Sequence, residues 1–369
     1  NYDSINKSWI KKFNSLSKTD KKLYNESLCV KFSIPKTGLA RKEISIPNPL
    51  HQSKLSEILI KNYSFLESIY KKSKISSSRP IIDTTKNRAY ITVDSYNQFI
   101  DKCIMDSLGF KYELSLDISR FFPTLYTHVI PWAIHTKKTA KQKRNDKSLL
   151  GNQIDDHTRF TQSNQTMGIP IGPDSSLLIS EIIGCTIDYI LQYKYKNISG
   201  HRYIDDYKFY FKTLSEAENF CDYLRETLRS YELDINEEKT GIELLPKPFT
   251  PEWVIMLSSF KFRETKQKQE TDIKNFFSLA IDYSIKYPKD SVLKYAIKCL
   301  ESHTFNNSNF SLLESCIFHY LMSDTDVIQE LYYFLNTSRD LISKRKLQNI
   351  MNDYIEYHGD RTTNSMAQF

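Results

Sequence analysis

Three aspartates in two short segments could together bind divalent metal ions. Asp117 ends the segment YELSLD, and Asp205 and Asp206 stand between RYI and YKFYF. Adjacent carboxylates repel each other, so a bound cation would stabilise the pair. Mg²⁺ prefers carboxylate oxygens plus substrate phosphates, and two such ions can bind the attacking and leaving oxygens of a phosphoryl transfer. For each segment alone, a solvated Asp-Asp turn and a helix cap or Asx-turn at Asp117 are the alternatives.

A glycine-containing loop is the third element that could contact a substrate. The chain has only nine glycines, and two of them, Gly168 and Gly172, flank Pro170 in the loop GIPIGPDSS. Glycine lets the backbone approach a ligand closely. The helix that we expect after this loop would offer unpaired N–H groups to phosphate oxygens. The alternative is a tight loop that only packs against its neighbours.

Hydrophobic periodicity indicates the elements that would position these residues. Residues 112–126 are expected to form a strand that runs into a turn and a helix, and residues 200–213 alternate in the manner of a half-buried strand. Strands and helices are mixed within 31–245, which indicates an α+β domain. Three prolines at 246–251 predict a boundary, and helical spacing dominates 252–369. Further expected elements are a helical extension at 1–30, a strand within 31–50, a helix at 51–70, a Ser-rich basic loop at 71–80 and an amphipathic helix at 215–233.

Composition excludes several classes of protein. The 369 residues include 51 Lys and Arg against 44 Asp and Glu, a net charge of +7, and 40% of the residues are hydrophobic. That length and composition predict a globular protein of about two domains. No apolar run reaches the roughly 18–20 residues of a membrane-spanning helix, and no signal peptide opens the chain. The six cysteines lack metal-binding spacing. We therefore expect a reducing, cytoplasmic location without membrane contact. The first residue is Asn1 and not Met, so we expect the natural chain to be longer.

One segment is more basic than the chain as a whole. Residues 136–147 contain six basic residues and one acidic residue, a local charge of +5. Such a run could contact the phosphates of a DNA product, or it could simply be a solvated face; the sequence leaves both readings open. The candidate DNA-binding residues are Lys137, Lys138, Lys141, Lys143 and Arg144.

Taken in order, these segments resemble the motifs of a reverse transcriptase over about residues 35–245. LSLDISRFF resembles the first palm motif, GIPIGPDSSLLISE the second, YIDD the Tyr-x-Asp-Asp hairpin and LRSYELDINEEKTGI the fourth. GLARKEISIPNPLHQSKL resembles a motif of the fingers. The resemblance implies a right-hand polymerase with an N-terminal extension at 1–30, fingers at 31–110, a palm at 111–250 and an α-helical domain at 251–369, which need not be complete.

The resemblance also assigns roles to individual residues. Asp117 and Asp205 would bind two Mg²⁺ ions, with Asp206 as a supporting carboxylate and Ile118 as a further metal ligand, and Lys239 would act as the general acid for pyrophosphate. Phe122 would exclude a ribose 2′-OH, so the substrates would be dNTPs. The loop residues Gly168, Pro170 and Gly172 would lie beside the nucleotide and the template base. Candidate residues for binding the triphosphate are Arg41, Lys42, Arg79 and Arg88.

Two features narrow the resemblance to one subgroup of reverse transcriptases. Ile171 stands where retroviral, retron and group II intron enzymes have Gln, and LYTHVIPWAIHTKKTAKQKR resembles abortive-infection polymerases of the AbiK type, one of the unknown groups of reverse transcriptases. The resemblance to AbiK-type polymerases implies a homo-oligomeric enzyme of antiphage defence with a helical-repeat domain in place of a thumb. Its DNA synthesis would be template-independent and primed by a protein hydroxyl, and the single-stranded DNA product would stay covalently attached. The resemblance does not identify the priming residue; Tyr2 and Tyr24 are candidates. An enzyme that copies a bound noncoding RNA and a catalytically silent nucleic-acid-binding scaffold are the alternatives.

Overall fold

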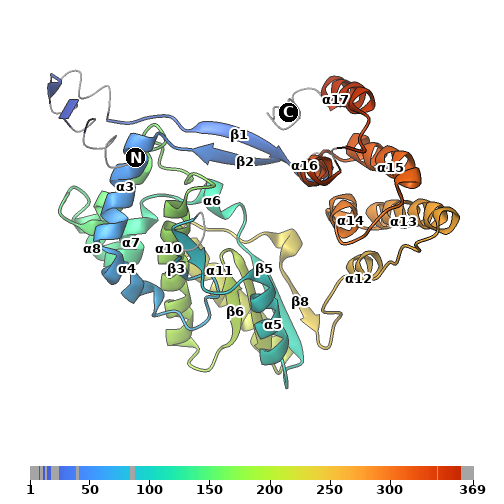
Figure 1. Ribbon diagram of the computed structural model, residues 1–369. Coiled ribbons are helices and arrows are strands. Elements are labelled where there is room, and N and C mark those ends of the chain that lie inside the picture. Colours follow the sequence, from blue (N-terminus) through green and yellow to red (C-terminus); the bar gives the residue numbers. More distant parts are fainter. Residues whose placement is uncertain are drawn as a thin grey trace. The chain divides into compact units, whose positions relative to one another are not determined.

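The computed structural model describes residues 8, 11–12, 15–17, 25–38, 41–83, 88–338 and 340–358. Contacts between residues divide the chain into two units (Figure 1). The first, which we call the catalytic unit, comprises residues 1–30 and 45–247, and the second, the helical unit, comprises residues 31–44 and 248–369. The division of the chain into fingers, palm and C-terminal domain remains a prediction.

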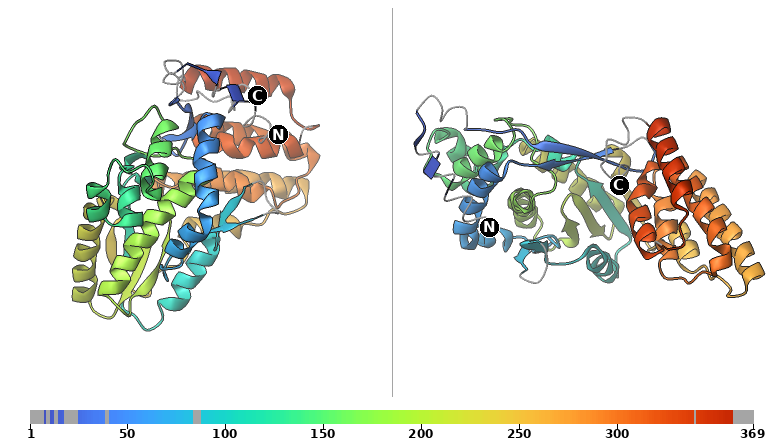
Figure 2. Two further views of the ribbon diagram at one scale, coloured as in Figure 1. Left: turned by 90° about the vertical axis from the view of Figure 1, so that its left-hand side faces the viewer. Right: turned by 45° about the horizontal axis from the view of Figure 1, so that its top comes forward.

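A four-stranded antiparallel sheet forms the centre of the catalytic unit (Figures 1 and 2). Its strands are β6 (Ser199–Tyr203), β7 (Asp206–Phe211), β5 (Tyr112–Asp117) and β8 (Gly241–Leu244), in that spatial order. The first palm motif is therefore on the central strand β5, and the Y-x-D-D hairpin consists of the edge strand β6, the turn after it and the central strand β7. The alternating pattern of 200–213 is confirmed as a hairpin of two strands.

The two faces of this sheet have different neighbours. Leu114 and Leu116 on β5 lie opposite Phe209 and Tyr207 on β7, and all four are buried. They pack in one core with helices α10 (Asp174–Lys194) and α11 (Leu214–Ser230). Since successive side chains alternate between faces, Asp117 and Asp206 lie on the opposite face. Helix α5 (Tyr96–Asp106) contributes to a smaller core on that face.

Further short elements surround the sheet. Helix α11 begins with a capping box, in which Thr213 accepts from the Glu216 N–H and the Glu216 side chain accepts from Thr213. The same motif begins α5, so local polar signals fix both helix starts. The other elements of this unit are α3 (Pro49–Lys61), α4 (Tyr63–Tyr70), β3 (Pro80–Ile82), β4 (Tyr90–Thr92), α6 (Phe121–Thr124), α7 (Val129–His135), α8 (Lys137–Gln142), α9 (Leu150–Phe160) and the 3₁₀ turn η1 (Glu237–Lys239).

The helical unit combines most of a β-hairpin with six α-helices of the described chain. The hairpin consists of β1 (Val30–Pro35) and β2 (Arg41–Ile46). Thr37, between the two strands, shares a hydrogen bond of 2.7 Å with Ser291, and Gln329 donates to the carbonyl of Pro35 at 2.9 Å. These bonds join the hairpin to helices far along the sequence. The helices are α12 (Glu252–Ser258), α13 (Lys266–Lys286), α14 (Val292–Leu300), α15 (Phe310–Ser323), α16 (Ile328–Thr337) and α17 (Lys344–His358).

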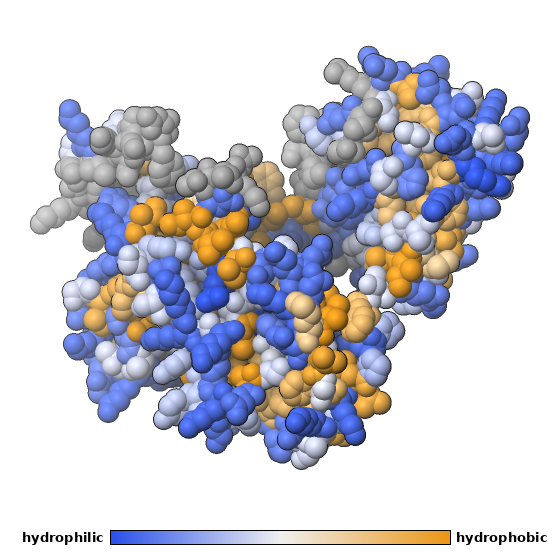
Figure 3. Space-filling view, turned by 60° about the horizontal axis from the view of Figure 1, so that its bottom comes forward, coloured by the Kyte–Doolittle hydropathy of each residue, from blue (hydrophilic) through white to orange (hydrophobic). Residues whose placement is uncertain are grey.

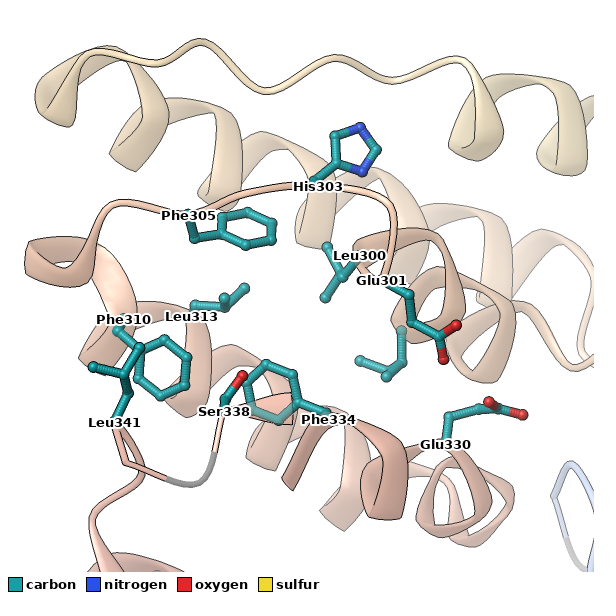
Figure 4. Close-up of a pocket in the computed structure, with 11 residues that line it drawn as sticks. Leu300, Glu301, His303, Phe305, Phe310, Leu313, Glu330, Phe334, Ser338 and Leu341 are labelled. Atoms are coloured by element: carbon teal, nitrogen blue, oxygen red, sulfur yellow. The ribbon is translucent and has the colours of Figure 1, made fainter. Parts of the chain in front are cut away.

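An apolar cavity of about 220 Å³ lies among the helices of this unit (Figure 4). Phe310 and Phe334 stack at one side of it with ring centroids 5.6 Å apart. Glu301 and Glu330 lie together at another side of the cavity in Figure 4. None of the predicted site residues lines it. The cavity therefore belongs to the helical unit and not to the catalytic chemistry.

The surface is mixed in character. On the face drawn in Figure 3, apolar side chains occur in separate groups among polar ones. Exposed large hydrophobic residues include Ile82 on β3, Leu244 on β8 and Ile285 on α13. Among the described residues, no helix is both long enough and apolar enough to cross a membrane.

The predicted Ser-rich loop has an unexpected environment. Residues 73–78 lie beside β6, where Ser76 forms a parallel bridge with Arg202. Ser73, Ser77 and Ser78 are almost completely buried. The loop is thus part of the interior, because its hydroxyls find buried polar partners.

Candidate active site

The register of the sheet brings two predicted carboxylates directly opposite each other. Asp117, the last residue of β5, is the partner of Asp206, the first residue of β7. Like charges in directly opposed positions destabilise a sheet. Asp205 is adjacent in the turn, and its carbonyl accepts a hydrogen bond from the Ile118 N–H at 3.1 Å. The structure therefore gathers Asp117, Asp205 and Asp206 at one end of two neighbouring strands.

The proximity of the three carboxylates changes the pKa of Asp206. Burial, together with the charges of Asp205 and Asp117, raises the pKa of the Asp206 carboxyl to about 6, despite the opposing effect of Lys239. A hydrogen bond with Asp117 contributes to the same shift. A nearby positive charge favours the ionised form of a carboxyl whose pKa is raised in this way. The cluster therefore has the electrostatic character of a cation site.

Two side chains from the segment after α11 contact Asp117. Lys239 donates from Nζ to Asp117 Oδ1 at 3.0 Å, and Asn236 donates from Nδ2 to Oδ2 at 3.1 Å. Burial lowers the pKa of Lys239, but its bond to Asp117 and the three aspartates outweigh this effect and raise the pKa. Lys239 therefore stays cationic beside the carboxylates. The motif LDINEEKTG predicted the role of Lys239 but not that of Asn236, although both residues belong to it.

Asn236 also fixes the backbone at the end of β5. Its N–H donates to the Asp117 carbonyl at 2.8 Å, and Ile118 forms a bridge with Ile235. The Ile118 side chain is buried. Its predicted role as a metal ligand could therefore come only from its backbone carbonyl.

The turn between β6 and β7 is backbone-strained. Ile204, the variable residue of the Tyr-x-Asp-Asp motif, has φ of 58°. A β-branched residue in this left-handed region is a conformational outlier; it costs about 1–3 kcal/mol and persists only where its surroundings enforce it. Two hydrogen bonds do so: the Ile204 N–H donates to Ser78 Oγ at 2.7 Å, and Arg202 Nη1 donates to the Ile204 carbonyl at 3.0 Å.

The glycine-containing loop adjoins the segment that carries Phe122. The N–H of Gly168 donates to the Leu125 carbonyl at 2.8 Å, and the N–H of Ile169 donates to the Phe122 carbonyl at 2.9 Å. Gly168 has φ of 82°, and a Cβ there would lie 2.8 Å from the carbonyl oxygen of Pro123. The loop can approach this segment so closely only because residue 168 is glycine.

The remainder of the loop meets the start of α10. The Pro170 carbonyl accepts a 2.5 Å hydrogen bond from Ser176. Arg88 donates to the Gly172 carbonyl at 3.3 Å and to Asp174 at 2.8 Å. The structure therefore brings Arg88 together with Gly172, and Asp174 partly neutralises it.

The other residues that were predicted to bind the triphosphate lie in two different units of the chain. Arg79 precedes β3, and its Nε is buried with no hydrogen-bond partner among the described residues. Arg41 and Lys42 lie on β2 of the helical unit, where Arg41 Nη2 donates to the Ser33 carbonyl at 2.9 Å. Lys42 is exposed. Arg79 thus has an unsatisfied donor within the catalytic unit, whereas Arg41 is already engaged with its own hairpin.

The basic segment forms the short helix α8 and the turn after it. Lys137 is half-buried: its ammonium lies 4.1 Å from the ring centroid of Trp132 and donates to the Ser230 carbonyl at 2.9 Å. This lysine therefore has a packing role as well as a charge. The remaining four candidates are exposed, namely Lys138, Lys141, Lys143 and Arg144. Tyr2 and Tyr24 lie outside the described residues.

The donors present suit a hard divalent cation. Among the residues that the structure describes, no group of three or more Asp, Glu, His or Cys side chains is arranged to bind one ion. Mg²⁺ in nucleotide-transfer sites needs only one or two carboxylates, because phosphates and water complete its coordination. Asp117 and Asp206, mutually repelling and adjacent to Asp205, provide such oxygen donors. They could bind the ion once Lys239 no longer occupies Asp117.

Comparison with solved structures finds distant likenesses to telomerases. Apo telomerase from Candida tropicalis has 13% identity and a TM-score of 0.42, with 90% of this chain and 68% of that chain covered. A form truncated from the C-terminal domain has 14% identity and a TM-score of 0.42, with coverage of 62% and 52%. Telomerase from Candida albicans in complex with a TWJ fragment of telomeric RNA has 12% identity and a TM-score of 0.41, with coverage of 99% and 67%. These scores are too low to support a functional argument.

A comparison with protein-family models is decisive. No curated protein matches the chain. The family model for reverse transcriptase (RNA-dependent DNA polymerase) matches residues 35–287, a range that includes the carboxylate cluster, the glycine-containing loop and Lys239. The chain therefore belongs to the reverse transcriptase family and is a nucleotidyltransferase.

Proposed function

We propose that this protein is an Mg²⁺-dependent DNA polymerase that adds dNTPs to a hydroxyl of a protein without copying a template. The observation that carries the catalytic part is the register that places Asp117 opposite Asp206, with Lys239 bound to Asp117. In nucleotidyl transfer, a 3′ or side-chain oxygen attacks the α-phosphorus of the dNTP, and pyrophosphate leaves with the electrons of the broken P–O bond.

Each residue of the cluster has a distinct task in this mechanism. Asp117, Asp205 and Asp206 would bind Mg²⁺, which lowers the pKa of the attacking hydroxyl and neutralises the triphosphate. Lys239 is cationic and 64% exposed at its side chain. It can therefore move from Asp117 to the leaving pyrophosphate and supply a proton there. Phe122 is positioned by the loop at 168–169 and would contact the sugar of the incoming nucleotide.

Template independence is supported by the side chain at position 171. Where common reverse transcriptases carry Gln, this chain has Ile171, whose carbonyl accepts a hydrogen bond from the Ser45 N–H at 2.9 Å. An aliphatic side chain cannot donate or accept a hydrogen bond. A polar contact beside the template base is therefore absent at this position, which favours synthesis without a template.

The biological setting is proposed from the motif resemblance. The segment 125–144 and the helices after residue 248 support an AbiK-like polymerase of antiphage defence with a helical-repeat domain in place of a thumb. Such an enzyme would act in the cytoplasm as a homo-oligomer and retain its single-stranded DNA product covalently.

One incubation separates these possibilities. Purified protein is supplied with Mg²⁺ and each labelled dNTP, without template or primer, and then denatured and separated by size. Protein-primed synthesis predicts label that migrates with the protein, survives denaturation and is removed by DNase. Label in free DNA alone contradicts protein priming, and loss of labelling after RNase treatment favours the RNA-templated alternative.

Two variants test the site itself. Asp117→Asn keeps the side-chain volume and should abolish incorporation without unfolding the protein. Asp222→Asn, on the exposed side of α11, is the matched control and should retain wild-type activity, because the Asp222 side chain is 76% exposed and pairs with Arg225 of the same helix. If Asp117→Asn incorporates dNTP at the wild-type rate, the assignment of the catalytic cluster is wrong. No metal-dependent incorporation by the wild type would support the silent scaffold.

A further inference from the structure

A completely buried ionic network lies beneath the catalytic turn. Arg202 on β6 and the two carboxylates Glu181 and Asp188 on α10 all have 0% exposed side chains. Arg202 Nη1 donates to Glu181 Oε1 at 2.7 Å, and Nη2 donates to Asp188 Oδ2 at 2.9 Å. Gly184 makes room for the guanidinium, since a Cβ there would lie 2.6 Å from the Arg202 Cζ. One helix and one strand are thereby joined through a single side chain.

Three buried serines donate to carboxylate oxygens that also accept hydrogen bonds from Arg202. Ser73 donates to Asp188 Oδ2 at 2.7 Å. Ser76 donates to Glu181 Oε2 at 2.8 Å, and Ser78 donates to Glu181 Oε1 at 2.7 Å. These hydroxyls come from the segment 73–78, so the network fixes this segment as well. Buried charges persist in a fold only when they are paired and hydrogen-bonded in this way.

Two members of the network also contact the Tyr-x-Asp-Asp turn. Ser78 Oγ accepts the Ile204 N–H at 2.7 Å, and Arg202 Nη1 donates to the Ile204 carbonyl at 3.0 Å. The backbone N–H and the carbonyl of Ile204 are thus both hydrogen-bonded to members of the network. Ile204 is followed directly by Asp205 and Asp206, so the conformation of this one residue sets the direction of both carboxylates.

We propose that Arg202 and Ser78 are positioning residues for the catalytic carboxylates, acting through the backbone of Ile204. The role rests on the proposed function, in which Asp205 and Asp206 bind the divalent cation. Buried ion pairs are weak evidence for stability, because desolvation offsets their attraction. In some proteins such groups instead fix one arrangement among several. Here that arrangement is the left-handed turn that presents the carboxylates.

The serine pair offers a matched experiment. Ser78→Ala and Ser76→Ala each remove one hydroxyl that donates to Glu181, but only Ser78 accepts from Ile204. Each variant of the full chain is measured for its unfolding midpoint, its Mn²⁺ affinity by electron paramagnetic resonance, and kcat and KM for dNTP incorporation. Loss of an outer-shell partner typically weakens metal binding or activity by about 10–100-fold. We expect that loss in Mn²⁺ affinity and kcat for Ser78→Ala, with KM nearly unchanged, and less than about 3-fold for Ser76→Ala.

The outcomes distinguish positioning from stability and from a failed function. If Ser78→Ala keeps wild-type Mn²⁺ affinity and kcat, or if both variants lose activity in proportion to their midpoints, the positioning role is overturned. If the wild type neither binds Mn²⁺ nor incorporates dNTP, the proposed function itself fails. Should Ser78→Ala not fold, Arg202→Lys is the second variant. It retains the positive charge but lacks the guanidinium fork that reaches Ile204, and it should show the same loss in kcat; wild-type kcat would contradict the proposal.

Discussion

Replacing Arg202 with Met should destabilise the protein strongly and in a pH-dependent manner. Methionine fills a similar volume but carries no charge, so Glu181 and Asp188 would remain buried at 0% exposure without a cation. Removing one partner from a buried ionic cluster typically costs about 3–5 kcal/mol. The free energy of unfolding of a whole domain is about 5–15 kcal/mol. The variant should therefore be the least stable of the substitutions described here.

The sign of the pH effect follows from the two carboxylates. In the wild type, burial raises the pKa of Asp188, whereas for Glu181 the effect of burial is outweighed by Arg202, and its pKa is lowered. Without Arg202, burial raises the folded-state pKa of both groups above their unfolded values. A raised pKa favours folding at low pH and loses that contribution as the pH rises through the folded-state value. The deficit of Arg202→Met should therefore be larger at pH 8 than at pH 5.

Urea unfolding followed by circular dichroism at the two pH values measures this deficit. Arg229→Met is the control. Arg229 and Asp234 are both exposed, with 3.7 Å between Arg229 Nε and Asp234 Oδ1, and such surface pairs contribute about 0–1 kcal/mol to stability. A loss below about 1 kcal/mol for Arg202→Met, or a deficit equal at pH 5 and pH 8, would refute the reasoning that two uncompensated buried carboxylates set the cost.

Three further substitutions probe the site. Phe122→Ala should increase incorporation of ribonucleotides relative to deoxynucleotides, measured as the ratio of kcat/KM values; an unchanged ratio would remove Phe122 from sugar discrimination. Lys239→Gln should lower the rate of incorporation by about 10²–10⁴-fold, the usual contribution of a general acid, while Mn²⁺ binding persists; activity within 3-fold of wild type would exclude that role. Gly168→Ala should lower stability by about 1–3 kcal/mol through crowding, since its Cβ would lie 2.8 Å from the Pro123 oxygen; an unchanged urea midpoint would contradict the loop geometry.

The elements around the carboxylates could be predicted because their signals are local. Period-two alternation after Asp206 and the strand that ends at Asp117 require no knowledge of distant residues. The order of the motifs then indicates that the two strands belong to one site. The contact of Asn236 with Asp117 depends on a turn that brings together residues 119 positions apart. In the sequence, the only indication of this contact is that Asn236 lies three residues before Lys239.

The buried serines could not be predicted for the opposite reason. A run such as SKISSS has the composition of an exposed loop, and its burial depends on Glu181 and Asp188, more than 100 residues away. These two acids stand seven positions apart on a largely apolar helix, which places them on one face. That spacing, combined with an Arg two residues before Ile204, was the available signal. Polar residues on an otherwise apolar helix face deserve a search for a buried partner.

The hairpin β1–β2 has a consequence for biosynthesis. Its hydrogen bond from Gln329 to Pro35 joins residues 294 positions apart. At a synthesis rate of about 5–20 residues per second, the hairpin leaves the ribosome on the order of 15–60 seconds before this partner is made. Residues 45–247 of the catalytic unit are complete well before then. During translation the hairpin is therefore made long before Gln329, its hydrogen-bond partner in α16. A ribosome-bound nascent chain can form the sheet and the carboxylate cluster before this hydrogen bond forms.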